Sequence, residues 1–391
     1  MKQTVWVALA IAALFGSADA SAKKAEFSLP PYAGLYEPQG KDERGLWMEL
    51  DEVERGLRDA PRVVRDTEIN TYLRKVLCDA VGSDRCKAVR IYLIQNDVFN
   101  ASMAPNGMMQ VNTGLLSRVH SEAELASILG HEFAHFERRH TLQKFREARN
   151  SKSWANWLLV LGAGFSVNTT NARNSLVIGF WAFSRSMEVE ADLLGANFIN
   201  ASHYRLQASS IWKRSLQEDN AIRSDNGMRK IMRLTPGLTD SHPTDMQRVL
   251  YFEDLEMAQS ADGDDGKDRY RAATNRILPL LFDGLVKSNQ FGSVDFVIRG
   301  RGDALGWNGE LTFYHAELYR LRGNPRDLMT ARDLYVLATK FSDAPPEVWR
   351  GLGLCELRLG NTDAGKVALR EYLLRNPAAK DADSIKLILE G

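Results

Sequence analysis

The amino-acid sequence predicts an α+β fold that is mainly helical, with a small β-sheet confined to the N-terminal half. Apolar residues recur at helical spacing from Ile69 to Leu77, which predicts an amphipathic helix with one face in a core. Residues 89–95 alternate and are rich in β-formers, which predicts a strand. An Asn-Gly pair between the apolar runs 99–104 and 108–112 is a strong hairpin signal. Beyond residue 267 the apolar spacing is helical throughout.

The N-terminal residues have the pattern of a secretory signal. Lys2 is followed by an unbroken apolar run from Val5 to Phe15, and small residues at Ala18 and Ala20 suit a cleavage point. That run is too short to cross the roughly 30 Å hydrocarbon core of a bilayer. We therefore expect a signal peptide over 1–20 and an extended lead-in over 21–40, with a buried N-terminal helix as the alternative. In a Gram-negative bacterium the destination would be the periplasm.

Composition excludes one class of partner and bears on the compartment. Lys+Arg and Asp+Glu are equal at 50 each, so a nucleic-acid partner is not expected. Cys78 and Cys86 flank a Gly-Ser-Asp turn and could close a disulfide, as an oxidising compartment allows. Cys355 is left over within an apolar helical pattern, where a buried thiol acts as a small hydrophobe.

The C-terminal part is predicted to be a separate helical domain. Residues 259–268 are polar, acidic and contain glycine, which predicts a linker between a domain at 41–258 and one at 269–391. The second domain approaches the 34-residue tetratricopeptide signature at Trp349, Leu352, Gly353, Ala364, Leu369 and Pro377. A looser copy places Ala316, Gly323, Ala331 and Pro345 in comparable positions. An ordinary helical bundle is the alternative.

Two apolar stretches, 154–167 and 175–183, follow the central helix of the first domain. Each is too short to cross a membrane. A buried helical hairpin is the simpler interpretation, and a hairpin that touches a membrane or covers a site is the alternative.

The most distinctive segment begins at the capping box Ser121-Glu122-Ala123-Glu124, which fixes the start of a helix. That helix carries His131-Glu132-Phe133-Ala134-His135. Residues four apart share a helix face, so both imidazoles can bind one metal ion. Glu132 is rotated by about 100° and can take a proton from a metal-bound water. The motif predicts a zinc-dependent hydrolase site with Glu132 as the base, against the alternative of two structural histidines.

A catalytic zinc needs a third protein ligand and an open fourth position. His140 lies on the opposite side of a continuous helix from His131, and we expect it at the surface or behind the ligands. Glu188 and Asp192 are four apart on one helix face, so Glu188 can bind zinc while Asp192 accepts a hydrogen bond from a ligand imidazole. Small residues at Ala191 and Gly195 would let the two helices approach closely.

At these residues the sequence resembles a known family. The motif His131-Glu132-x-x-His135, followed by Ser184-Arg185-Ser-Met-Glu188-Val-Glu-Ala191-Asp192, is similar to the gluzincin metallopeptidases related to the CAAX prenyl protease and the HtpX protease. More narrowly, it resembles their soluble periplasmic branch, which adds tetratricopeptide repeats. The resemblance covers residues 41–255 well and the C-terminal part only weakly. It implies one zinc per chain, with Glu188 as third ligand.

The resemblance also implies roles for residues outside the ligand set. Ser241-His242-Pro243-Thr244-Asp245-x-x-Arg248 matches the same branch, in which the histidine can occupy the open metal position and the arginine helps to stabilise the oxyanion. The predicted hairpin would line the substrate cleft, with contacts from Asn100, Ala101, Gln110, Val111 and Asn112. Met108–Asn112 would pair with the main chain of an extended substrate. The substrate class implied is unfolded or misassembled envelope protein.

These patterns predict a zinc metalloendopeptidase that is exported to the periplasm, with peripheral membrane contact possible at 154–183. The alternative function is a chaperone-like module that assists outer-membrane protein assembly through its helical repeats and cleaves little. A closed structural zinc site is disfavoured, because such sites use four Cys or His ligands and only two histidines and a glutamate are evident.

Overall fold

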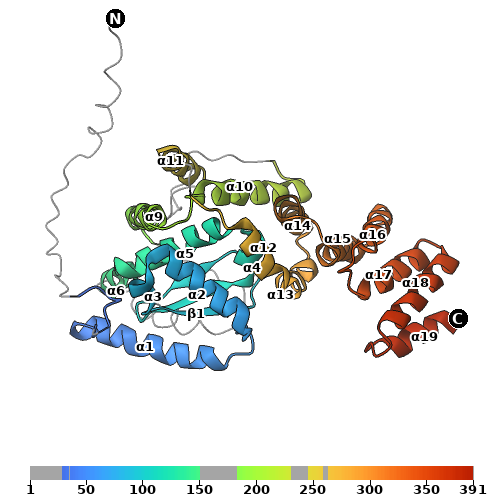
Figure 1. The fold of residues 1–391 in the computed structure, drawn as a ribbon, viewed down its shortest axis with the longest axis horizontal. Coiled ribbons are helices and arrows are strands. Elements are labelled where there is room, and N and C mark those ends of the chain that lie inside the picture. The colour runs from blue at the N-terminus through green and yellow to red at the C-terminus, as the bar shows by residue number, and fades with distance from the viewer. Residues whose placement is uncertain (1–28, 35, 150–182, 230–244, 259–262, 391) are drawn as a thin grey trace, which may run out of the picture.

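The computed structural model describes residues 29–34, 36–149, 183–229, 245–258 and 263–390. Within these residues a small sheet lies among helices at one end of the molecule, and a row of helices extends from it at the other end (Figure 1). The fold is therefore α+β and mainly helical, as the sequence predicts. The predicted signal peptide, most of the two apolar stretches at 154–183, and His242 lie outside the described residues.

The N-terminal elements are α1 (Gly40–Asp59), α2 (Thr67–Val81), α3 (Ser83–Cys86), β1 (Arg90–Ile94), β2 (Ala101–Met103), β3 (Met108–Asn112), α4 (Thr113–Arg118), α5 (Glu122–Glu137) and α6 (His140–Arg149). After the gap come α9 (Arg185–Asn200), α10 (Ala208–Asp225) and α11 (Asp245–Ala258). The C-terminal elements are α12 (Lys267–Asn275), α13 (Leu278–Phe282), the 3₁₀ turn η1 (Leu285–Lys287), α14 (Phe291–Leu305), α15 (Gly309–Arg322), α16 (Pro325–Ala338), α17 (Glu347–Arg358), α18 (Thr362–Arg375) and α19 (Ala382–Glu390).

The sheet corrects one prediction about the hairpin. Its strand order is β1-β3-β2, with β1 parallel and β2 antiparallel to β3. The hairpin of β2 and β3 is thus confirmed, but β3 is the central strand and both of its edges are already paired. Met108–Asn112 cannot pair with a substrate main chain, because its own backbone groups are used within the sheet. Of the hairpin strands, only β2 is at an edge.

The sheet is buried on both faces. Leu93, Met109 and Val111 face the main core, where α2 and α5 also pack. On the other face, Ile94 and Met108 meet the buried leucines of α1 and Leu142 of α6. A central strand covered on both faces loses the alternation of a half-exposed strand, and four of the five residues of β3 are accordingly buried.

Helix α5 begins and ends on identifiable signals. Ser121 accepts a hydrogen bond from the backbone N–H of Glu124 at 3.1 Å, which caps the helix as the sequence predicts. The helix ends at Glu137, and Arg139 adopts a positive φ of 55° before α6 begins. This break redirects the chain, so His140 does not continue the α5 face geometry that the sequence prediction assumed.

The disulfide between Cys78 and Cys86 is present and ties the end of α2 to α3. Its Cα atoms are 5.1 Å apart, a usual separation for a bridged pair. Cys355 is a buried free thiol, as the apolar pattern around it suggests. Among the described residues, no helix has both the length and the apolar character needed to cross a membrane.

The predicted linker at 259–268 does not separate two independent cores. Residue Asp264 forms a backbone bridge with Tyr204, and α12 already begins at Lys267. Tyr270 of α12 is fully buried and its hydroxyl donates a 2.6 Å hydrogen bond to the carbonyl of Leu116. One continuous apolar core includes residues from α2 through to α17. The expectation of two separate cores was therefore wrong. An acidic, glycine-containing stretch can also lead the chain back onto the same core.

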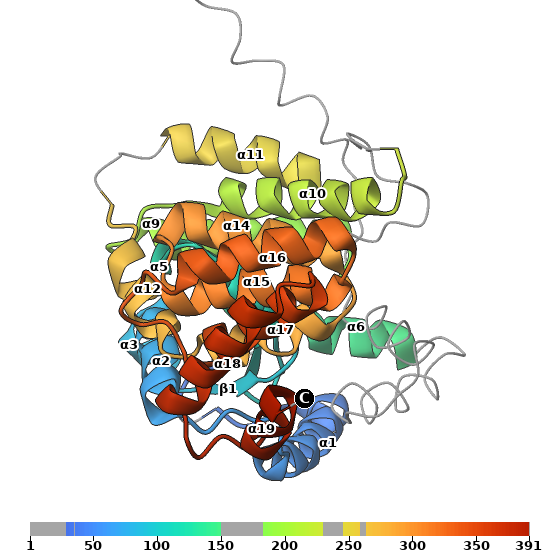
Figure 2. The ribbon, with the colours of Figure 1, turned by 90° about the vertical axis from the view of Figure 1, so that its right-hand side faces the viewer.

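The helices after α14 form pairs that extend away from the sheet (Figures 1 and 2). Short turns containing Gly323 and Gly360, both with positive φ, join α15 to α16 and α17 to α18. Gly351 faces Tyr335, and a Cβ at this glycine would fall 2.3 Å from the tyrosine ring. Helical hairpins stacked in this way agree with the helix-turn-helix units that the sequence predicts, while the tetratricopeptide assignment stays a prediction.

Candidate metal centre

The two histidines of the motif and Glu188 meet at one point. His131 and His135 lie one turn apart on α5, and Glu188 comes from the first turn of α9. Ligand atoms of the three residues all lie within 4.8 Å of one another. The two Nε2 atoms are 3.0 Å apart, and the carboxylate of Glu188 lies 3.6 Å from one and 3.8 Å from the other. The structure therefore brings together the three residues that the sequence proposed as ligands.

These separations fit a zinc ion. Ligands bound about 2.0–2.1 Å from a tetrahedral zinc lie about 3.3 Å from each other. The distances from 3.0 to 3.8 Å fall on either side of that value. Two imidazole nitrogens and a buried carboxylate are also the donors that a catalytic zinc uses, and three protein ligands leave the fourth position for water. The donor set and its spacing both fit a divalent cation.

Close packing of α5 and α9 brings Glu188 to the histidines. Gly195 of α9 faces the backbone of α5. A Cβ added at this glycine would lie 3.1 Å from the backbone nitrogen of His131 and 3.2 Å from its Cα. Gly130 faces Gly195 in return. Any side chain at Gly195 would force the helices apart, so a small residue is required for the carboxylate to reach the metal position. This agrees with the close approach that the sequence predicts.

Asp192 holds His131 from behind, as expected. The Nδ1 of His131 donates to the Asp192 carboxylate at 2.7 Å, which leaves Nε2 with the lone pair that a metal needs. Asp192 also accepts hydrogen bonds from Arg248 and from the hydroxyl of Tyr251. Burial alone would raise the pKa of Asp192, but Arg248 and His131 lower it to about 2. The carboxylate is therefore charged and fully engaged.

Arg248 lies beside the ligands. Its guanidinium contacts Asp192, lies 3.5 Å from the Nδ1 of His131 and 4.0 Å from Glu188, and stacks 3.6 Å over the ring of Trp212. The sequence proposed a role on the oxyanion. The contacts with Asp192 and His131 fit an arginine that positions both residues, while its approach to Glu188 keeps the guanidinium next to the ligand set. The role on the oxyanion stays a prediction.

His135 has its own supporting residues, which sequence reasoning did not assign. Its Nδ1 lies 2.8 Å from the Nδ1 of His140, and the Nε2 of His140 lies 3.4 Å from Glu190. Phe183 stacks on the His135 ring with centroids 3.9 Å apart. If His135 donates from Nδ1, its Nε2 is free to bind the metal. His140 is fully buried, so of the two expected positions the surface is excluded.

Glu132 stands next to the ligands without being one of them. It is partly buried, and within the described residues no hydrogen bond or ion pair to its carboxylate is recorded. Burial raises its pKa to about 7, although the charge of His131 opposes this. A divalent cation at the site would lower that pKa again. A carboxylate with no fixed partner beside a metal-bound water is suited to accept a proton.

The five predicted substrate contacts divide into two groups. Asn100 is exposed and Ala101 is partly exposed, and both lie at the edge strand β2 or just before it. Val111 is buried in the core, and the side chain of Asn112 donates to the carbonyl of Val98. Gln110 lies on the central strand β3, directly before Val111. Asn100 and Ala101 therefore lie where a substrate could pair, whereas Val111 and Asn112 have structural roles.

Some supporting residues could have been found from the sequence. Tyr251 follows Arg248 by three positions and so shares its helix face, and both contact Asp192. Trp212 carried no such signal, because it lies on a different helix from Arg248 and far from it in the sequence. For His140 the sequence left two positions open, at the surface or behind the ligands, because its place depends on the turn at Arg139.

One helix carries two histidines and an adjacent glutamate, and a second helix supplies a carboxylate as the third ligand. Together with a small edge strand, they define a metallopeptidase domain of the His-Glu-x-x-His type. The model of peptidase family M48 matches residues 64–256. These residues form an M48 peptidase domain, and members of that family are zinc-dependent.

Curated relatives agree with the family. The chain is 28% identical over 214 residues to a beta-barrel assembly-enhancing protease of Yersinia pestis, across 50% of this chain and 42% of that protein. It is 32% identical over 115 residues to a mitochondrial metalloendopeptidase OMA1 of Arabidopsis thaliana, across 29% and 23%. With a beta-barrel assembly-enhancing protease of Escherichia coli it is 23% identical over 252 residues, across 60% and 51%. The matches span from 23% to 51% of the length of these relatives.

Proposed function

We propose that this chain is an exported zinc-dependent endopeptidase that hydrolyses peptide bonds in unfolded or misassembled envelope proteins. The observation that carries the proposal is the convergence of His131, His135 and Glu188, with ligand atoms within 4.8 Å of one another and Glu132 alongside. One zinc per chain would be held by these three residues. The M48 domain match and the metalloendopeptidase names of relatives support the same reaction class.

Each residue has a distinct task in this proposal. A bound zinc would act as a Lewis acid and lower the pKa of its water to about 7. Glu132 accepts the proton of the attacking water at its carboxylate and then delivers it to the departing amine nitrogen. Asp192 and His140 keep the two imidazoles in the orientation and tautomer that direct Nε2 inward. Arg248 and Tyr251 fix Asp192.

The free edge of β2 is the proposed substrate-binding strand. Asn100 and Ala104 form backbone hydrogen bonds with Asn112 and Met108 of β3. By alternation Ala101 and Met103 direct their N–H and C=O groups away from β3, where Ala101 is partly exposed and Met103 is buried. No backbone partner of these two residues is recorded in the described part of the chain. An extended substrate can pair there through its main chain, which gives affinity with little sequence preference. This suits unfolded chains, whose backbones are accessible.

The proposal also covers export and partners. The signal-like pattern at 1–20 and the Cys78–Cys86 disulfide both suit an oxidising compartment such as the periplasm. Two relatives are named as beta-barrel assembly-enhancing proteases, which supports envelope proteins as the substrate class and the outer-membrane assembly machinery as a partner. Capping of the metal by His242 stays a prediction of the family resemblance, which His242→Ala would test through the rate of basal cleavage.

Glu132→Gln tests the proposed reaction directly. The amide keeps the shape of the side chain but cannot accept the proton, so cleavage of unfolded casein should fall by at least about 10²-fold. Zinc content should not change, because Glu132 is not a ligand. Glu253→Gln, on an exposed part of α11, is the matched control and should cleave as the wild type does. Retention of wild-type cleavage by zinc-loaded Glu132→Gln would exclude Glu132 as the base.

One observation favours a second function in addition. The last helices carry large exposed apolar side chains, with Val367 63% exposed, Leu374 76% and Leu387 70%. Large apolar side chains that are exposed on neighbouring helices suit a protein interaction surface when they form a patch. A chaperone-like role of the C-terminal helices would use them, and replacing the three by Ser should then weaken binding of an unfolded envelope protein while leaving cleavage of a short peptide unchanged. Unaltered binding would argue against this second function.

A further inference from the structure

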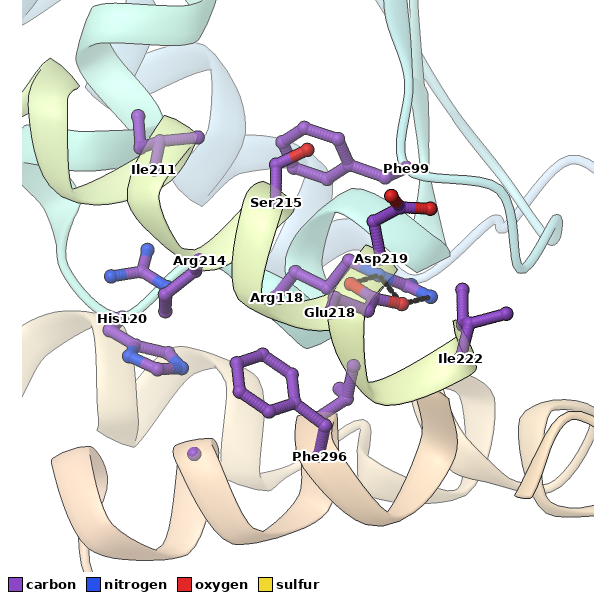
Figure 3. A pocket seen from close by; sticks show the side chains of 12 residues that line it. Phe99, Arg118, His120, Ile211, Arg214, Ser215, Glu218, Asp219, Ile222 and Phe296 are labelled. Atoms are coloured by element: carbon purple, nitrogen blue, oxygen red, sulfur yellow. Dashed lines mark hydrogen bonds and ion pairs between the residues drawn. The ribbon is translucent and has the colours of Figure 1, made fainter. Parts of the chain in front are cut away.

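A cavity of about 240 Å³ lies between α10 and α14, away from the metal centre. Ile211, Ser215 and Ile222 of α10 form one wall, and Phe296, Val297 and Gly300 of α14 form the facing wall (Figure 3). The remaining side is closed by Phe99, Arg118 and His120. Small-molecule pockets usually measure roughly 300–1,000 Å³, so this volume suits a single side chain better.

The cavity is connected to the elements that border the metal. Phe99 immediately precedes Asn100 and the edge strand β2, and Pro105, just after β2, lines a small recess together with His135. The edge strand therefore runs from the cavity towards the metal ligands. On α10, Ile211 lines the cavity, and its neighbour Trp212 stacks on Arg248, which lies beside the proposed metal ligands.

The length of strand between Phe99 and Met103 corresponds to a few substrate residues. Phe99 and Met103 are four positions apart, which in a strand is about 13 Å. An extended chain paired to β2 would cover that distance with about four residues. A substrate side chain in the cavity would thus belong to a residue about four positions from the scissile bond.

The charges around the cavity are already paired. The guanidinium of Arg118 makes two 2.8 Å hydrogen bonds to Glu218, and Arg214 binds Glu124. At the rim, Asp219 pairs with Arg223 at 3.0 Å. A charged occupant would find no opposite charge in the lining that is not already paired. Its transfer from water into the cavity would therefore be costly. The lining therefore selects against charged groups.

His120 is the remaining polar group of the lining. Burial and the charges of Arg214, Arg301 and Lys267 lower its pKa to about 3, so the ring is neutral. Among the described residues no hydrogen bond to its ring is recorded, and the position of a Cβ on Gly300 is only 3.6 Å from its Cε1. A neutral imidazole that lines the same cavity as Phe99 and Phe296 suits the face or edge of an aromatic ring.

We propose that this cavity is a subsite for a large uncharged side chain of the polypeptide substrate, aromatic above all, carried about four residues from the scissile bond. This inference rests on the proposed endopeptidase function and adds a selectivity to it. Main-chain pairing at β2 would accept many sequences, and the subsite would favour segments with a bulky apolar residue at one fixed distance. Such residues are exposed in unfolded chains and buried in folded ones.

The test uses fluorogenic peptides that share one scissile bond cleaved by the full-length wild type. They differ only at the residue three to five positions away, on either side, as Phe, Leu, Gly or Asp. At one of these positions kcat/KM for Phe should exceed that for Gly by about 10- to 100-fold, with Asp no better than Gly. Equal kcat/KM values for the whole set would overturn the subsite.

Two variants fill the cavity from opposite walls, Gly300→Phe from α14 and Ser215→Phe from α10. In each, the Phe-to-Gly ratio of kcat/KM, measured within the same variant, should fall towards one. The matched control is Arg299→Leu, which changes the exposed side chain next to Gly300 and should keep the ratio. A ratio that persists in both filling variants contradicts the assignment. Failure of the zinc-loaded wild type to cleave any peptide contradicts the endopeptidase function itself, and the subsite with it.

Discussion

At the scale of single residues, the site depends on the groups behind the ligands as much as on the ligands. Asp192 connects three side chains, because it accepts hydrogen bonds from His131, Arg248 and Tyr251 within a buried environment. The neighbouring carboxylate raises the pKa of His131 despite the opposing effect of burial, so Asp192 strengthens the donor that faces the metal position.

Asp192→Asn should therefore weaken zinc binding by about 10- to 100-fold, because the amide cannot match the charge that orients His131 and pairs with Arg248. A chelator competition titration of the purified protein measures this. Glu253→Gln, an exposed carboxylate change on the neighbouring helix, provides the reference. If Asp192→Asn competes for zinc as well as that reference does, Asp192 has no part in holding the site.

The spacing in the sequence was sufficient to pair His131 with His135 and Glu188 with Asp192, because a continuous helix fixes which residues share a face. It could not decide between the surface and a position behind the ligands for His140. The contact of His140 with His135 requires α5 to stop and the chain to turn at Arg139, and a positive φ at an arginine has no reliable local signal.

At the scale of elements, the contact between α5 and α9 decides whether the ligand set is complete. Two helices can bring a carboxylate within about 4 Å of two imidazoles only when their backbones approach closely, and Gly195 allows this. The same pattern of small residues was visible in the sequence. The pairing of β1 with β3 was not, because parallel neighbours are joined through a crossover with no fixed turn signature.

Gly195→Ala tests this packing. The new Cβ would lie 3.1 Å from a backbone nitrogen of α5, and such overpacking costs about 1–3 kcal/mol. Alanine gains about 0.5–1 kcal/mol over glycine within a helix, which offsets only part of this. We expect a lower Tm and weaker zinc binding. Gly56→Ala makes the same change in α1 where the Cβ meets nothing within 4 Å, and it should raise Tm. Identical behaviour of the two variants would rule out a tight α5–α9 contact.

At the scale of the whole molecule, the peptidase domain and the first C-terminal helices share one core. Tyr270, Leu278 and Phe282 are buried in the cluster that also contains the residues of α5. A sequence boundary placed by composition marks where the chain is polar, but composition does not show which core the following helix joins. The separation becomes clearer only further along, where α17 to α19 pack mainly on their own neighbours (Figure 2).

Two truncations distinguish these boundaries. Removal of 269–391 would expose the core that Tyr270 fills, so that protein should be unfolded or aggregated by circular dichroism and size-exclusion chromatography. Removal of 345–391 takes away only α17 to α19 and should leave zinc content and cleavage of a short peptide near wild type. A folded, zinc-binding protein that ends at 268 would instead restore the predicted linker as a true domain boundary.

The central claim is that Glu188 completes a zinc site begun by His131 and His135. Zinc content of the purified mature protein, measured together with casein cleavage, tests it most directly when wild type and Glu188→Gln are compared. We predict one zinc per chain and cleavage for the wild type, and loss of both for Glu188→Gln under the same dialysis, because a neutral amide is a poor zinc ligand. A Glu188→Gln protein that keeps one zinc per chain and cleaves casein at the wild-type rate would contradict the account.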